Sequence, residues 1–305
     1  MSDTSPVWAL LLAATLVGPS SVFVQAQDAA TSLQPASKGH VSYDKDGCRL
    51  ARVFGAADDP TSLILTKLYP GDAFRLRVGG RAFRPYMKAD KAYVQFGPTE
   101  ARQDVNYFAG ELGNNVPAMI FRGTVNVAGP TTEQEQLLKQ STWNSPFRLP
   151  PIAAERKAAV TYLSISRSVG KAIRLETGSL RAPLTALDKY VDNLLTTWGI
   201  DVARHANLSR IVAPRESPGN WVTDNDYPTG PMMRGQQGVV NSRLSVDSSG
   251  TVTACHIQQS TRPAEFDEAV CKALTKKARF HPALDAQGNA MASYYPSTFV
   301  FMMNR

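Results

Sequence analysis

The sequence predicts an α+β protein with two folded parts, a mostly-β domain over residues 41–201 that ends in an amphipathic helix and a small ββαβ domain over residues 227–305. Three observations support this fold class. Short runs with the period of two that strands require recur through residues 61–177. Apolar residues at helical spacing follow over residues 183–198, and after residue 227 the patterns come in the order strand, strand, helix, strand.

The composition is that of an ordinary globular protein. The 305 residues suffice for about two domains, and 43% are hydrophobic while 19% are charged. The net charge of +7 is spread along the chain, without a cluster of Lys and Arg interleaved with stacking aromatic residues. We therefore expect no nucleic-acid partner and interpret the charges as solvated faces.

Residues 1–26 are typical of a secretory signal peptide, because the apolar run Val7–Val17 is followed by short residues before Ala26, where a signal peptidase cleaves. We expect a periplasmic protein. The alternative is an uncleaved anchor over Val7–Val24, which would hold the chain at the inner membrane. Residues 27–40 are rich in Ala, Ser, Gln and Pro, and their composition predicts a disordered tail.

Six strand-like runs fill the first domain and predict a sandwich or a barrel-like sheet. They are Thr61–Leu68, Ala73–Val78, Lys91–Phe96, Ala118–Val127, Ala158–Ser166 and Lys171–Thr177. The clearest alternates three apolar residues with Arg75 and Arg77 after a Pro-Gly-Asp turn.

The domain ends with a helix whose apolar residues repeat every three or four positions: Leu184, Leu187, Val191, Leu194 and Trp198. Pro183 stands at its start and Gly199 just past its end. Because such a stripe must be buried, we expect it to pack on the preceding sheet and to close the domain near Asp201. Prolines, Gly219 and turn residues predict a linker over residues 202–226.

The second domain is predicted from four runs. Strands over Val239–Val246 and Thr251–Gln258 flank an Asp-Ser-Ser-Gly turn, a helix covers Phe266–Phe280, and Ser293–Met302 supplies the last strand. In the second strand Val252 and Ile257 are five residues apart and cannot share a face under strict alternation. The pattern predicts either a bulge near Cys255 or burial of only one of the two.

Six motifs of this region, in order, resemble the C-terminal domain of TonB proteins. They are Tyr227-Pro228, the Gly-x-x-Gly-x-Val of Gly235–Val240, the Asp-x-x-Gly-x-Val of Asp247–Val252, Phe266-Asp267-x-Ala269, Arg279-Phe280-x-Pro282 and Pro296-x-x-Phe299. The chain departs from that family at Ser242, where an apolar residue is usual, and it lacks both the membrane-helix histidine and the long Pro-rich tract of TonB proteins.

The resemblance implies a protein that binds an outer-membrane TonB-dependent receptor, or another envelope protein, in energy-coupled transport across the outer membrane. In that family the last strand leaves an open sheet edge, which accepts an extended segment of the partner. The partner-binding residues implied here are Tyr227, Pro228, Ser297, Thr298, Phe299, Val300, Phe301 and Met302. For Tyr227-Pro228 a purely structural role at the start of the fold is an equal alternative.

Two of the three cysteines are predicted to form a disulfide. Cys255 lies on the second predicted strand and Cys271 on the helix expected to pack over it, and an exported protein resides where disulfides persist. The alternative is a pair of buried thiols. Cys48 remains, and we interpret it as a core residue because no catalytic partner pattern accompanies it.

Catalytic and metal-binding motifs are missing from the sequence. The four histidines are scattered, and neither a nucleophile elbow nor a phosphate loop is present. We expect no enzyme, no cofactor and no metal. Two alternatives stay open: an exported enzyme or ligand-binding β domain over residues 41–201 that carries the TonB-like module as an address, and an envelope scaffold that self-associates, as a homodimer for example, through its open edges.

Overall fold

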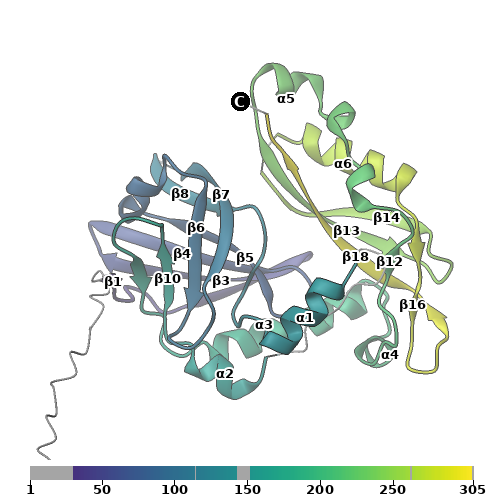
Figure 1. Cartoon of the computed structure of the whole chain (residues 1–305), viewed down its shortest axis with the longest axis horizontal. Coiled ribbons are helices and arrows are strands. Elements are labelled where there is room, and N and C mark those ends of the chain that lie inside the picture. The colour runs from purple at the N-terminus through teal and green to yellow at the C-terminus, as the bar shows by residue number, and fades with distance from the viewer. Residues whose placement is uncertain (1–29, 114, 143–151, 262, 304–305) are drawn as a thin grey trace, which may run out of the picture.

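The computed structural model describes residues 30–113, 115–142, 152–261 and 263–303. The predicted signal peptide over residues 1–26 lies outside these residues. Within them, no helix has both the length and the apolar character needed to cross a membrane. The fold class is the predicted one, with a large N-terminal β-sheet and a smaller C-terminal unit of strands and helices (Figure 1).

The N-terminal strands form one sheet in the order β1-β11-β10-β6-β7-β8-β5-β4-β3-β2, with β9 paired to β5. Their bounds are β1 Thr31–Leu33, β2 His40–Asp44, β3 Gly47–Ala56, β4 Asp59–Lys67, β5 Ala73–Gly79, β6 Lys91–Phe96, β7 Gln103–Leu112, β8 Val116–Phe121, β9 Val125–Asn126, β10 Leu163–Ser166 and β11 Ile173–Leu175. Short helices flank them: η1 Arg81–Tyr86, α1 Thr132–Gln140 and α2 Ala154–Ala159.

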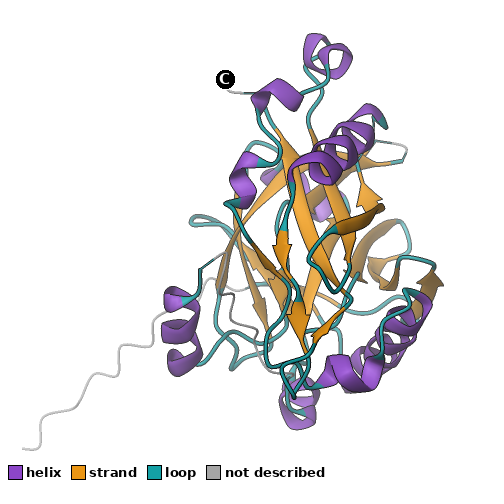
Figure 2. Ribbon diagram, turned by 90° about the vertical axis from the view of Figure 1, so that its right-hand side faces the viewer, coloured by secondary structure: helices purple, strands orange, loops and turns teal. Residues whose placement is uncertain are grey.

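The sheet closes into a barrel through the residues that follow β1. The N–H of Ala36 donates to the carbonyl of Val53 on β3 at 2.9 Å, and the N–H of Gly55 donates to the carbonyl of Gln34 at 2.8 Å. Because β1 also pairs with β11, hydrogen bonds run around the whole ring. Figure 2 shows the molecule from the side of the C-terminal unit, with the strands in orange. Buried aromatic and aliphatic side chains fill the interior of the barrel.

The described part of the predicted disordered tail is therefore ordered, and the prediction is corrected for residues 30–40. Thr31–Leu33 pair in parallel with β11, and His40 begins β2. The composition of this segment shows only that it cannot build a core. Strands β11 and β3 supply hydrogen-bonding partners for this segment, and its local composition does not reveal them.

Helix α3, Arg181–Thr197, joins the two units. Leu184, Leu187 and Val191 belong to the barrel core, as the helical spacing predicts. Leu195, one turn further on, belongs to the second core together with residues of the C-terminal unit. A single apolar stripe is thus shared between two cores, so the helix does not end the first domain but links it to the second.

The C-terminal unit has a three-stranded antiparallel sheet in the order β14-β13-β18 with α6 across one face. Its elements are α4 Val202–Ala206, β12 Ala213–Pro214, η2 Pro218–Asn220, η3 Asp224–Asp226, α5 Thr229–Met233, β13 Gly238–Val246, β14 Val252–Ser260, α6 Glu265–Lys277, β15 Phe280–His281, β16 Ala283–Leu284, β17 Ala290–Met291 and β18 Ser293–Phe301. Acidic residues in the first turn of α6 and lysines in its last turn match the helix dipole.

Strand β14 has a bulge, which was the first of the two alternatives that its pattern predicted. Ser245 pairs with Ala254 but Val246 pairs with Val252, so Thr253 is the extra residue. This shift places Val252 and Ile257 on the same face, where both contact the core under α6. A second shift lies between Asn241 and Ser242 of β13.

The predicted disulfide is present between Cys255 of β14 and Cys271 of α6, whose Cα atoms lie 5.6 Å apart. Cys255 follows the bulge at Thr253, which returns its side chain to the face covered by α6. The bond therefore fixes the helix to an outer strand of the sheet.

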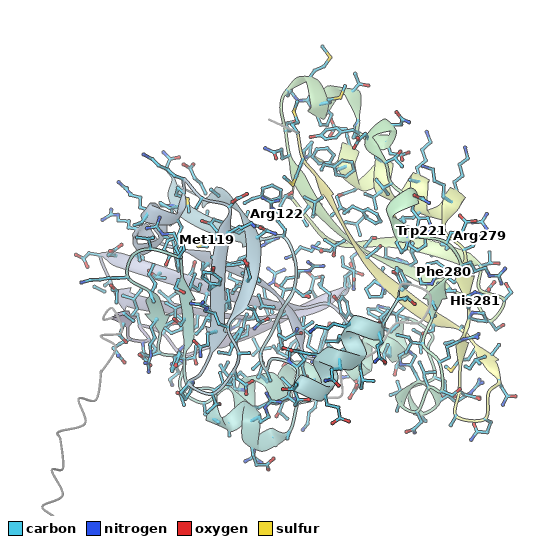
Figure 3. All side chains as sticks on the ribbon, viewed as in Figure 1. Met119, Arg122, Trp221, Arg279, Phe280 and His281 are labelled. Atoms are coloured by element: carbon cyan, nitrogen blue, oxygen red, sulfur yellow. A yellow bond between two sulfur atoms is a disulfide. The ribbon has the colours of Figure 1, made fainter. Side chains whose placement is uncertain are left out.

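The residues predicted as a linker, 202–226, are folded onto the C-terminal unit, which corrects that prediction. Strand β12 pairs with β15, and the N–H of Arg215 donates to the carbonyl of Arg279 at 2.8 Å. Trp221 is buried, with its ring 5.3 Å from that of Phe280 (Figure 3). The prolines and turn residues mark a segment without long helices or strands, and such a segment can still pack against a core.

Candidate partner-binding edge

Strand β18 forms one edge of the C-terminal sheet. Within the described residues it pairs only with β13, in an unbroken register from Gly238 opposite Phe301 to Val246 opposite Ser293. Its other side consequently presents main-chain groups that a further strand could bind.

The register shows which residues of β18 direct their backbone outward. The N–H of Val239 donates to the Thr261 hydroxyl at 2.8 Å, and the N–H of Thr261 donates to the Val239 carbonyl at 2.9 Å. The backbone of Val239 is thus directed to the β14 side, away from β18. Val300 is opposite Val239, so this is a non-hydrogen-bonded pair and the N–H and carbonyl of Val300 are directed to the open edge.

The same alternation directs the backbone of Thr298 and Pro296 outward. Because β18 pairs only with β13 among the described strands, this register leaves the N–H groups of Thr298 and Val300 without a partner in the sheet. Pro296 has no N–H and offers only its carbonyl. A proline at this position leaves the β13–β18 ladder intact and limits strand addition to the C-terminal half of β18.

Both faces of the sheet pack against other parts of the chain. Val240 and Leu244 pack under α6, while the opposite face lies against the barrel. There Gln258 donates to the carbonyls of Asp46 and Leu68 at 3.0 and 2.8 Å, and Arg75 donates to the Thr298 hydroxyl. An incoming strand can therefore bind at the edge but not on a face.

Two arginines lie between the barrel and the sheet. The guanidinium of Arg243 lies 4.1 Å from the centre of the Trp198 ring, and burial lowers the pKa of Arg243 to about 10. Arg122, just after β8, lies on the side of the barrel next to the C-terminal unit (Figure 3) and donates to the sulfur of Met302 at 3.0 Å. The Arg122 contact holds the end of β18 beside the barrel, and the Arg243 contact holds β13 beside the end of α3.

Tyr227 lies behind β18 and not along its open edge. Its hydroxyl donates to the carbonyl of Gln236, and its ring centre is 5.2 Å from that of Phe301 and 5.6 Å from that of Phe266. Burial raises the pKa of Tyr227. Pro228 precedes α5. These contacts favour the structural role for Tyr227-Pro228 that the sequence left as an alternative.

The remaining predicted residues lie on β18, or directly after it in the case of Met302, and alternate in direction. Phe299 and Phe301 pack into the core under α6, whereas Val300 and Met302 are exposed. Ser297 hydrogen-bonds to Ser242 across the strands at 2.8 Å, which explains how a hydroxyl is accommodated at the position where the TonB family usually has an apolar residue.

Sequence reasoning missed an exposed apolar surface at the end of β18. Val300 and Met302 are 38% and 43% exposed, and Met233 on α5 is 82% exposed. The sulfur of Met303 would lie 4.0 Å from a Cβ at Gly235, just after α5. We call Met232, Met233, Val300, Met302 and Met303 the methionine surface; the adjacent methionine pairs in the sequence were its only signal.

The structure offers little for catalysis at this edge. Within the described ranges, no group of His, Cys, Asp and Glu could hold a metal ion. Cys48 is buried in the barrel, and burial raises the pKa of its thiol to about 12. The arrangement provides hydrogen-bonding backbone and an apolar surface, which are properties of a binding site.

A three-stranded antiparallel sheet with one helix across it and an open last strand defines a small ββαβ module. Residues 223–303 match the family model of the Gram-negative bacterial TonB protein C-terminal. The resemblance found in the motifs is thereby confirmed for this segment, and the chain carries the C-terminal domain of TonB-like envelope proteins. No curated protein matches the chain.

Proposed function

We propose that this is an exported, periplasmic TonB-like protein whose open β18 edge binds an extended segment of an envelope partner by strand addition. The partner class is the outer-membrane TonB-dependent receptor, and the process is energy-coupled transport across the outer membrane. The family model supports the partner class, and the geometry of β18 supports the binding mode.

The observation that carries this proposal is the outward backbone of Thr298 and Val300 on a strand with one free side. A peptide that pairs there gains main-chain hydrogen bonds whatever its sequence. The methionine surface lies next to the same stretch and can adapt its flexible side chains to different apolar residues of the peptide.

The test uses the purified mature chain and synthetic peptides from the periplasm-facing segments of TonB-dependent receptors. Val300→Pro removes one outward N–H without touching the ladder to β13, and Val300→Ala keeps that N–H as the matched control. We expect Val300→Pro to weaken peptide binding about fivefold or more, in line with the loss of one hydrogen bond of about 1 kcal/mol and a steric clash.

Equal affinity of the Val300→Pro and Val300→Ala variants would exclude β18 as the docking strand. Sedimentation of the unliganded chain tests the alternative that a second copy of the chain occupies the edge. A dimer that Val300→Pro dissociates would show that a second copy of the chain, and not a receptor segment, pairs with β18.

A further inference from the structure

A cavity of about 500 Å³ lies where the barrel meets α4, and no residue of β18 lines it. The β4–β5 loop, α2 and α3 provide one side of its lining, and residues 202–211 provide the other. Residues 41–201 do not enclose it alone, so it belongs to the junction of the two units. Its volume is within the range of small-molecule sites.

One wall of the cavity is charged. The carboxylate of Asp188 accepts from Lys67 and, at 2.8 Å, from Lys157, and Lys157 also lies 3.4 Å from Asp72. Burial alone would raise the pKa of Asp188, but the hydrogen bonds from the two lysines outweigh it and lower that pKa. Burial likewise opposes the charge of Lys157, and its carboxylate partners raise its pKa.

Lys67 has hydrogen-bonding capacity to spare. Its side chain is 2% exposed, and Asp188 is its only hydrogen-bond acceptor among the residues that the structure describes. An ammonium group has three N–H donors. A buried ammonium beside a cavity therefore has donors available for an acceptor, such as a carboxylate, that enters it.

The net charge of the lining discriminates between ligands. Lys67 and Lys157 balance Asp72 and Asp188, and Asp192, exposed on α3, adds a negative charge. A simple anion would meet a lining with a net negative charge, and a simple cation would meet two buried ammonium groups. A zwitterion can pair its carboxylate with the lysines and its ammonium group with Asp192.

The other wall is apolar. Val191 and Leu195 of α3 face the cavity together with Val202 and Leu208 from the segment around α4. These aliphatic side chains can bury one or two apolar side chains of a ligand, whereas they would leave a polar ligand body without hydrogen bonds.

We propose that the cavity binds an apolar zwitterion, a free amino acid or short peptide with aliphatic side chains, whose carboxylate accepts from Lys67 and whose ammonium group approaches Asp192. The ligand contacts both the barrel and the segment that leads into the TonB-like domain. Its binding therefore braces the junction and raises the melting temperature of the chain.

The test is isothermal titration calorimetry of the full mature chain with leucyl-leucine and L-leucine as probes. Octanoate, which keeps the carboxylate and an apolar chain but lacks the ammonium group, is the matched ligand control. We expect one saturable site for leucyl-leucine, with octanoate weaker by about tenfold or more because a charged hydrogen bond is lost.

Lys67→Met should weaken leucyl-leucine binding about tenfold or more. Lys189→Met, which removes an exposed lysine of α3 outside the cavity, should leave leucyl-leucine binding unchanged. If Lys67→Met fails to fold, Leu208→Trp tests the site in its place, because it fills the cavity and keeps every charge. Circular dichroism reports folding of each variant.

The β18 edge could also bind a dipeptide. The Val300→Pro variant distinguishes the two sites, because leucyl-leucine that binds in the cavity should bind this variant with unchanged affinity. Octanoate binding as tightly as leucyl-leucine would overturn the zwitterion assignment. Absence of saturable heat with both zwitterions would overturn the site itself.

Discussion

The Cys48 thiol is enclosed by the barrel, where its sulfur lies 3.6 Å from the carbonyl oxygen of Leu187. Because only the thiolate reacts, and burial raises the pKa of Cys48 to about 12, the native chain should resist alkylation. We expect iodoacetamide at pH 8 to leave the folded chain unmodified and to add one group after denaturation without reductant. Intact-mass spectrometry measures this. Rapid modification of the native chain would contradict a buried thiol.

Asp188 and Lys157 should make stability depend on pH at both extremes. The pKa of Asp188 is lowered from 3.8 by its lysine partners, so its contribution is present above about pH 4 and lost as the pH falls through the lowered value. The pKa of Lys157 is raised from 10.5, so its contribution is present below that pH and lost as the pH rises through the raised value.

Urea unfolding across this range checks the prediction, with Lys157→Met as the comparison. The variant should lose less stability than the wild-type chain between about pH 10 and 11.5, because it has no lysine to deprotonate at this position. Parallel curves for the two proteins in that window would show that Lys157 is not coupled to folding.

Single residues also show what a sequence can and cannot reveal. The role of Tyr227 stayed open because a motif gives no side-chain direction, and the contacts with Phe266 and Phe301 favour the structural role. The charged wall of the cavity had no sequence signal, since Lys67, Lys157 and Asp188 are far apart in the chain and meet only when the barrel closes.

Among the elements, α6 and β14 are joined by the Cys255–Cys271 disulfide. The bond closes a loop with a sequence separation of 16, which corresponds to about 3 kcal/mol of stabilisation in the chain-entropy model. We expect a Cys255→Ala/Cys271→Ala variant to lose roughly that free energy of unfolding. Urea unfolding, with the reduced wild-type chain as the matched control, measures it. A loss below about 0.5 kcal/mol would show that α6 is held by packing alone.

Elements with regular patterns were predictable and irregular ones were not. β5, β6 and α3 follow clear periods and were found within two residues of their observed bounds. β7 was missed because polar residues such as Asp104 and Glu111 interrupt it, and because Tyr107 is the only one of its residues that is fully buried. β1 was missed because its order depends on pairing with β11, more than a hundred residues away.

At the scale of the whole molecule, the barrel and the C-terminal unit share α3 and a polar interface. Gln258 contributes two hydrogen bonds to barrel carbonyls. Gln258→Leu leaves the carbonyls of Asp46 and Leu68 without that donor, and we expect a loss of about 1 to 3 kcal/mol at the interface. Calorimetry should then show two separated unfolding transitions where the wild-type chain shows one. Gln287→Leu, in a surface turn outside this interface, is the control.

The arrangement of the two units was beyond prediction, although each unit had a recognisable pattern. Leu195 carries the same helical periodicity as Leu184, and nothing in that spacing shows that the two residues enter different cores. The segment over residues 202–226 packs through a few long-range contacts, such as those of Trp221, which have no local signature. The open edge of β18 followed from the family resemblance, while its outward-directed residues required the observed register.

The central claim is that a partner segment adds to β18 through Thr298 and Val300, and amide hydrogen exchange followed by nuclear magnetic resonance tests it most directly. The amides of Phe299 and Phe301 are directed to β13 and should be protected in the free chain, whereas those of Thr298 and Val300 should exchange fast. On addition of a receptor peptide, protection should appear at Thr298 and Val300. A peptide that binds while both of these amides continue to exchange at the rate of the free chain would contradict the account.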